Sequence, residues 1–195
     1  MRPLSWRNKI IAWLKKVVSY NRILTSTVIG FFFFLAARPT FLSICIALPI
    51  VFAGEVIRTW ASGCIVKNDT LTIAGPYGLT RNPLYLGNFF LGLGFVIMSG
   101  VIFLPFVFIP LFFFIYDSTI TREEEFLTNR YGDCFKIYKN SVPRFFPRID
   151  WAAFSAAFSN SCFDWSLIKK HREKNTWLAI LGVILLIIGK MWFQP

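Results

Sequence analysis

The sequence has a single histidine, His171, which lies in a run of cations at residues 169–172. A histidine-based zinc site, or a Ser-His-Asp triad near the other polar motifs, is therefore not expected. Four cysteines occur, and they show neither a CxxC motif nor the spacing of metal ligands: Cys45, Cys64, Cys134 and Cys162. No short apolar segment with a small-residue cleavage site follows the basic N-terminus, so the first apolar run is expected to remain in the mature protein. The sequence predicts no bound metal.

Acidic residues are also scarce, with 10 Asp and Glu against 21 Lys and Arg and a net charge of +11. Such a balance is one sign of nucleic-acid binding. Here, however, the cations flank apolar runs, a pattern that instead indicates contact with anionic lipid headgroups. We therefore expect a membrane surface, and no nucleic acid, as the partner of this charge.

Apolar surface is what the chain has in excess. Hydrophobic residues make up 55% of it, 23 residues are phenylalanine, and the mean hydropathy is +0.56. A soluble domain of 195 residues has too little interior to bury that much apolar surface. The sequence predicts an all-α polytopic integral membrane protein with about five transmembrane helices.

The five apolar runs cover residues 23–37, 41–60, 84–100, 101–120 and 177–192. A membrane-spanning helix needs about 20 residues, so the first run is short unless it begins near Val17. The last run spans only if it uses nearly every residue to Phe193, and a helix lying on the membrane surface is the alternative. We divide the chain into a basic amphipathic segment (1–22), a membrane core (23–148) and a C-terminal extension (149–195). The first segment is either an interfacial helix or a charged leader to the first span.

The distribution of cations predicts the orientation. Six lie in the first 22 residues and ten in segment 121–175, whereas the turns expected on the other side offer Arg38 and little else. Five spans with a cytosolic N-terminus satisfy every loop. The small size and the lack of a targeting segment favour a bacterial inner membrane over the endoplasmic reticulum.

Two polar segments are expected at the cytosolic face. The first, residues 75–87, places a turn, a cation, an amide and two tyrosines between apolar runs, which is unfavourable in a membrane protein unless the cluster binds something. Pro83 suits the first turn of a helix, whose free N–H groups can hold an anion. In the second segment, Glu123 and Glu124 recur with Tyr131 and Tyr138 at offsets that share one helix face.

Carboxylates, amides, aromatic rings and arginine together suit a zwitterionic cofactor that carries adenine. A merely structural polar rim is the alternative. Arg58 leaves a similar choice open. It lies three residues after Glu55 and can pair with it as an interfacial ion pair, or it can face a ligand cavity and contact substrate.

Two motifs carry a resemblance to a known family. The first is Gly75-Pro76-Tyr77-x-x-x-Arg81-Asn82-Pro83-x-Tyr85-x-Gly87. The second is Glu123-Glu124-x-x-Leu127-x-x-x-Tyr131-Gly132-x-x-Phe135-x-x-Tyr138-x-x-x-Val142-Pro143-x-x-x-Pro147. Occurring in this order with a helical hairpin between them, they resemble the isoprenylcysteine carboxyl methyltransferase family, which is related to the membrane phospholipid methyltransferases. The resemblance covers about residues 50–148.

This resemblance implies an integral membrane enzyme that binds S-adenosylmethionine at the cytosolic face and methylates a polar group of a lipid or lipid-linked substrate. The residues expected to bind the cofactor are Tyr77, Arg81, Asn82, Pro83, Tyr85, Gly87, Tyr131 and Tyr138. Those expected at the reacting end are Glu123, Glu124 and Arg144, with Arg58 at the substrate. The strap from Pro143 to Pro147 is expected to close the pocket.

The chain departs from the family pattern in two places. Asn82 stands where the family usually has histidine, and residues 149–195 extend beyond the usual ending. Asparagine can donate a hydrogen bond but cannot titrate near neutral pH. Methyl transfer to an ionised carboxylate or phosphate needs only in-line positioning, so the sequence favours an anionic acceptor. The alternatives are N-methylation of a phospholipid headgroup amine, and a non-catalytic membrane scaffold or small transporter that keeps the fold.

Overall fold

The computed structural model describes residues 22–66, 70–159 and 163–193, and in these it contains helices and no strands. The helices are α2 (Arg22–Ala36), α3 (Phe41–Cys64), α4 (Pro83–Met98), α5 (Leu104–Tyr131), α6 (Asp133–Ser141), α7 (Trp151–Ser159), α8 (Trp165–Lys170) and α9 (Glu173–Trp192), with a 3-10 turn η1 (Gly75–Gly78). The all-α prediction is confirmed. The amphipathic helix predicted for 1–22 lies, except for Arg22, outside the described residues.

All five predicted apolar runs are helical. By length and composition, α3, α5 and α9 can each cross a membrane, and α4 is a shorter apolar helix of 16 residues. Large apolar side chains such as Phe52, Phe106 and Leu185 are exposed on the outer faces of the three long helices. In a bilayer these faces contact lipid. The chain is therefore built as a polytopic membrane protein.

Helix boundaries differ from the expectation at three places. Helix α3 continues to Cys64, and α9 begins at Glu173 rather than at Trp177. The fourth apolar run and the first part of the polar segment after it form one continuous helix, α5, which ends at Tyr131. No glycine or proline lies between Pro110 and Gly132 to interrupt it, and Gly132 ends it with a φ of 55°. The prediction that Tyr138 shares one helix face with Glu123, Glu124 and Tyr131 is therefore wrong, because Tyr138 lies on α6.

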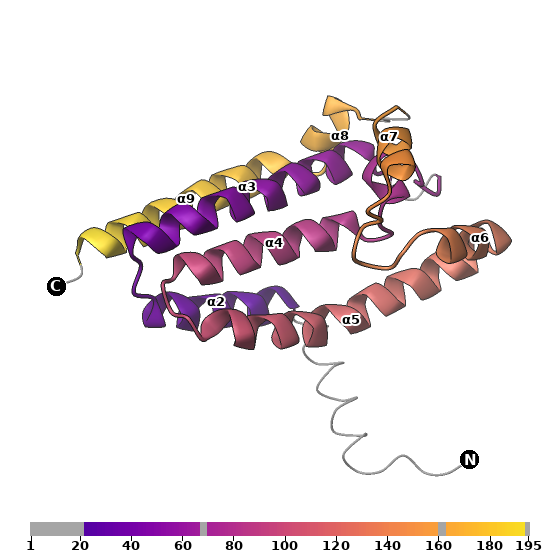
Figure 1. Cartoon of the computed structure of the whole chain (residues 1–195). Helices are drawn as coiled ribbons and strands as arrows, with labels where there is room; N and C mark the ends of the chain where they lie inside the picture. The colour runs from indigo at the N-terminus through magenta and orange to yellow at the C-terminus, as the bar shows by residue number, and fades with distance from the viewer. Residues whose placement is uncertain (1–21, 67–69, 160–162, 194–195) are drawn as a thin grey trace, which may run out of the picture.

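Helices α3 and α4 pack closely side by side (Figure 1) because small residues face each other across the contact. A Cβ atom added to Gly54 would lie 2.8 Å from the Leu91 backbone nitrogen and 2.9 Å from the Gly87 carbonyl oxygen. Gly87 thus lies in this helix interface. The close approach fixes α4, and with it the polar motif that precedes α4.

Substituting Gly54 with leucine is expected to lower the free energy of unfolding by about 1–3 kcal/mol, because backbone atoms of α4 must move. Gly182→Leu is the matched control, since a Cβ at that position meets nothing within 4 Å. Thermal unfolding of both variants in detergent checks this. Equal melting temperatures for the two variants would contradict the close packing.

Helix α9 is fixed by polar contacts at both of its ends. At its start, Glu173 accepts hydrogen bonds from Arg58 and Ser62 of α3. At its other end, Lys190 Nζ donates to the Phe34 and Leu35 carbonyl oxygens at 2.5 and 2.9 Å, where α2 ends. The Lys190 contacts satisfy carbonyl groups at the end of α2. The Glu173 contacts place α9 along α3.

The polar segments gather at one end of the helical assembly, around the end of α3 and the start of α4 (Figure 1). There, α7 and η1 contact each other, and α6 folds back from the end of α5. Gly75 opens η1 with a φ of 61°, a conformation that favours glycine, and its Cα faces Cys64 and Trp60. Residues 75–83 are therefore held against α3 before α4 begins.

Candidate functional site

A polar cleft of about 300 Å³ lies between the start of α4, the end of α5 and α6. The first motif lines it with Tyr77, Arg81, Asn82, Pro83 and Tyr85. The second motif lines it with Glu123, Glu124, Leu127, Tyr131, Phe135 and Tyr138. Residues 65–66 and 70–72 complete the wall. The fold thus brings most of the predicted site residues to one cavity.

Backbone hydrogen bonds join the first motif to the strap after α6. The Arg81 N–H donates to the Pro143 carbonyl at 2.9 Å, and the Arg148 N–H donates to the Leu79 carbonyl at 3.0 Å. Between them, the Thr80 hydroxyl donates to the Phe145 carbonyl at 2.8 Å. The strap therefore holds the backbone that carries Arg81.

Asn82 occupies the N-cap position of α4, although its side chain does not cap the helix. Its Nδ2 instead donates to the Arg144 carbonyl at 2.8 Å, and the residue is buried. The amide therefore ties the strap to the start of α4 while still lining the cleft. A neutral imidazole has one N–H donor where the amide has two.

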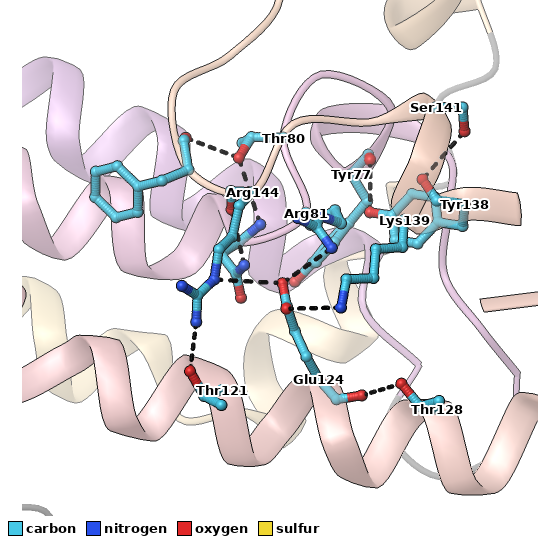
Figure 2. Close-up of polar contacts among 12 residues, drawn as sticks. Tyr77, Thr80, Arg81, Thr121, Glu124, Thr128, Tyr138, Lys139, Ser141 and Arg144 are labelled. Atoms are coloured by element: carbon cyan, nitrogen blue, oxygen red, sulfur yellow. Dashed lines mark hydrogen bonds and ion pairs between the residues drawn. The ribbon is translucent and has the colours of Figure 1, made fainter. Parts of the chain in front are cut away.

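Glu124 lies at the centre of three cations, as Figure 2 shows. Its Oε1 is 3.2 Å from Arg81 Nη1 and 3.7 Å from Arg144 Nε, and its Oε2 is 4.0 Å from Lys139 Nζ. The side chains of Arg81 and Glu124 are only 9% and 11% exposed. The carboxylate among these cations fixes the position of the guanidinium beside it.

The Arg81–Glu124 pair leaves hydrogen-bonding capacity in the cleft. Arg81 Nε is buried and makes no hydrogen bond within the described part of the chain, whereas Arg81 Nη1 and Glu124 Oε1 contact each other as an ion pair at 3.2 Å. Buried polar atoms without such a partner are unfavourable, and in native sites they commonly meet a ligand. The free Nε donor of Arg81 suits an anionic group, such as a ligand carboxylate.

Arg144 lies behind this pair and does not line the cleft. Besides Glu124, its guanidinium contacts Asp117 Oδ1 at 2.9 Å and Thr121 Oγ1 at 2.6 Å. These contacts fasten the strap to α5. The structure thus places Arg144 among the groups that support the site.

Tyr138 closes the inner side of the cleft. Its hydroxyl donates to the Tyr77 carbonyl at 2.8 Å, and burial raises the pKa of Tyr138 above its usual value. The phenol therefore remains protonated near neutral pH. It acts as a donor that positions η1 over α6 rather than as a base.

Arg58 and Gly87 lie outside the cleft. Gly87 packs in the α3–α4 interface, where an added Cβ would lie 2.8 Å from the Gly54 carbonyl. Arg58 Nε is 3.8 Å from Glu55 Oε2, so the predicted pairing of these residues is confirmed. Arg58 also forms a closer pair with Glu173 at 3.1 Å, and it donates to the Asn88 amide oxygen.

Sequence reasoning missed Glu173 as a buried partner because it stands among Lys169, Lys170, Arg172 and Lys174, which is typical of a solvated surface. It is 4% exposed. The available signal was its position as the first acidic residue of an apolar run, where a carboxylate suits a helix start. Lys139, the third cation at Glu124, was missed as well.

No metal site is found in the described ranges, where no group of three or more His, Cys, Asp or Glu residues could hold an ion.

Comparisons with known proteins place the chain among relatives. The family described as "Phospholipid methyltransferase" matches residues 34–134. Over 123 residues the chain is 31% identical to the cobalt-zinc-cadmium resistance protein CzcN of Cupriavidus metallidurans, covering 58% of this chain and 56% of that protein. Over 101 residues it is 32% identical to the nickel-cobalt-cadmium resistance protein NccN of Alcaligenes xylosoxydans xylosoxydans, covering 51% and 47%.

A third relative is the protein-S-isoprenylcysteine O-methyltransferase of Schizosaccharomyces pombe. It is 30% identical over 83 residues, which cover 43% of this chain and 35% of the relative. The chain thus spans about half the length, or less, of these curated relatives. No solved structure matches it.

Proposed function

The chain belongs to the phospholipid methyltransferase family, and we propose that it transfers a methyl group from S-adenosylmethionine to a lipid or lipid-linked substrate. The acceptor is an anionic carboxylate or phosphate group. The cleft before α4 holds the methyl donor, at the cytosolic face of a bacterial inner membrane. The family assignment confirms the resemblance drawn from the two motifs.

The observation that carries the proposal is the Arg81–Glu124 ion pair, with side chains only 9% and 11% exposed, in the lining of a cleft that also contains tyrosines. These residues fit the donor molecule. Arg81 binds its carboxylate through charge-assisted hydrogen bonds. The aromatic rings of Tyr131 and Phe135 cover adenine or the sulfonium, whose positive charge favours a π face.

The bound donor supplies a methyl group on a positively charged sulfur, and its transfer breaks the carbon–sulfur bond and forms a carbon–oxygen bond to the acceptor. The acceptor oxygen loses its negative charge in the same step, so no proton has to leave. The chain's residues therefore need only to bind, orient and exclude water. An asparagine at position 82, which cannot titrate, is compatible with this chemistry.

N-methylation of a phospholipid headgroup amine is the second candidate, and the family description favours it. An amine acceptor has to release a proton. Glu123 is the group available for this task, because it lines the cleft with an exposed side chain outside the Glu124 cation cluster. The two candidates differ in their product: the methyl group is bound to oxygen in the first and to nitrogen in the second.

Incubation of the purified full chain with methyl-labelled S-adenosylmethionine and a total lipid extract tests both. For a carboxylate acceptor we expect labelled lipid whose label is released as volatile methanol by mild base, because carboxylic esters hydrolyse. Label retained through base treatment indicates a methyl phosphate or a methylamine, which mass spectrometry of the labelled lipid then distinguishes. The absence of both labelled lipid and saturable donor binding by calorimetry would reject the enzyme and favour a scaffold or transporter.

Glu123→Gln separates the two candidates: with an amine acceptor it is expected to lower turnover at least about tenfold, because it removes the group that takes the released proton, whereas methylation of an anionic acceptor needs no base and should be unchanged. Glu125→Gln is the matched control, since Glu125 is exposed and does not line the cleft. Initial rates in the labelled-lipid assay compare the turnover of the two variants with that of the wild-type protein. Wild-type turnover in Glu123→Gln would reject the amine acceptor.

The proposed orientation rests on the cations near the cleft, which the positive-inside rule places in the cytosol. A variant with Cys134 as its sole cysteine is expected to react with a membrane-impermeant maleimide in inverted vesicles and not in right-side-out vesicles. Cys134 is exposed on α6, beside the cleft. Ile102→Cys, at an exposed position in the α4–α5 turn, is the control and should show the opposite pattern.

A further inference from the structure

A second and larger cavity lies deeper in the helical assembly. It has a volume of about 730 Å³, lies between α2, α4, α5 and α9, and is partly open, since its lining residues Phe31 and Leu186 are exposed. Its walls are almost entirely apolar, with Gly30, Phe34, Gly92, Phe112, Val183 and Leu186 among the residues that line them. The α9 wall comes from the part of the chain that follows the family match. A cavity of this kind favours hydrocarbon.

Two tyrosines separate this cavity from the polar cleft. Tyr85 lines the cleft and Tyr116 lines the cavity, and their ring centroids are 5.5 Å apart in an edge-to-face arrangement. Asn88, one turn after Tyr85 on α4, also lines the cavity. The two cavities therefore meet at the Tyr85–Tyr116 pair.

The polar end of the cavity presents a fixed donor. Arg58 donates to the amide oxygen of Asn88, and Glu173 holds Arg58 through both carboxylate oxygens at 3.1 Å. Because the arginine takes the oxygen of the amide, the Asn88 N–H₂ group remains as the donor. It makes no hydrogen bond within the described residues, so it is available to a carbonyl, ester or phosphate oxygen of a ligand.

We propose that this cavity binds one hydrocarbon chain of the methyl acceptor, whose polar group lies at the Tyr85–Tyr116 pair and accepts a hydrogen bond from Asn88. The inference rests on the proposed function and narrows its substrate to an amphiphile whose hydrocarbon chain enters this cavity. The cavity runs along α4 from Asn88 to Ser99, a length of about 17 Å at the helical rise. That length limits the chain that fits, and α9 helps to set the limit.

A photoactivatable palmitic acid that carries a diazirine near its chain end is the probe. With the detergent-solubilised full chain, we expect it to label peptides containing Phe95 and Leu186, which line the cavity. Gly30→Phe should reduce this labelling at least fivefold, because a Cβ at Gly30 meets nothing within 4 Å and the ring can enter the cavity. Gly182→Phe, at an equally open position outside the cavity lining, should leave it unchanged.

Equal labelling of Gly30→Phe and Gly182→Phe, or an equal loss in both, overturns the inference. Labelling of the wild-type protein only on its outer faces, at Phe52 and Phe106, also overturns it. A cavity filled by another segment of the chain would give that last result. Leu186→Trp, with Leu185→Trp as its control, fills the α9 wall independently if Gly30→Phe does not fold. Titration with S-adenosylmethionine separates the two proposals: failure of the proposed function abolishes donor binding by the wild-type protein, whereas failure of this inference changes only the labelling.

Discussion

Replacement of Arg81 by alanine is expected to weaken S-adenosylmethionine binding about 100-fold, which corresponds to about 2.7 kcal/mol. Arg81 is a cation in the lining of the cleft, and its buried Nε has no hydrogen-bond acceptor in the described ranges. Its loss removes the group that we assign to the ligand carboxylate. Lys139 and Arg144 still neutralise Glu124 in this variant, so the fold should persist.

Calorimetric titration in detergent measures the effect, with melting temperature as the check on folding. Arg81→Lys should lose about tenfold, because it keeps the charge but not the planar arrangement of donors. Arg130→Ala is the matched control, since Arg130 is exposed at the end of α5 and does not line the cleft. Unchanged donor affinity in folded Arg81→Ala would refute the assignment of this residue.

The apolar runs predicted the membrane helices because hydrocarbon permits few alternatives to helical backbone. Their ends were harder to predict. The sequence predicts an apolar helix over residues 101–120 and a separate polar helix after it, yet α5 runs without a break to Tyr131 through Glu, Leu and Arg residues that favour helix. A change in polarity indicates where the chain passes from hydrocarbon to water. The end of the helix is instead set by Gly132, whose backbone conformation is not helical.

For the site, the sequence predicted which residues share a pocket better than it predicted where each side chain points. Arg81 and Glu124 were predicted as members of one pocket, and the structure places them in contact although they come from distant segments. Arg144 was predicted at the reacting end, but its side chain contacts Asp117 and Thr121 outside the cleft lining. Its direction depends on the strap's backbone bonds to residues 79–82, and no local pattern encodes those.

The local composition around Glu173 does not indicate that this residue is buried and paired with Arg58. The cations around it in sequence lie mostly at the surface, and the cation that it pairs with, Arg58, belongs to another helix. The pairing requires α9 to lie along α3, and it is this arrangement that orients Asn88 at the apolar cavity. The C-terminal extension thus acts on Arg58 through the Glu173 carboxylate, in addition to its contact with α2 through Lys190.

Arg58→Leu is expected to be the most destabilising single change, lowering the free energy of unfolding by about 3–5 kcal/mol. It leaves the Glu173 carboxylate buried, with the Ser62 hydroxyl as its remaining hydrogen-bond donor within the described residues. A buried charge that loses its partner is far more unfavourable than the pair was favourable. Unfolding in detergent, followed by circular dichroism, measures the change.

The double variant Arg58→Leu/Glu173→Leu should recover most of that loss, because only Glu55 is then left without its cation, and Glu55 keeps the hydrogen bond from Thr59. The coupling energy of the cycle should exceed about 2 kcal/mol. The Lys136–Asp133 pair, with side chains 64% and 88% exposed, is the control and should give less than about 0.5 kcal/mol. Additive losses at Arg58 and Glu173 would show that the two charges act separately. If the double variant regains its stability but still fails to bind the photoactivatable fatty acid, the Arg58–Glu173 pair acts by positioning Asn88. In that case folding is restored but the contact with the ligand is not.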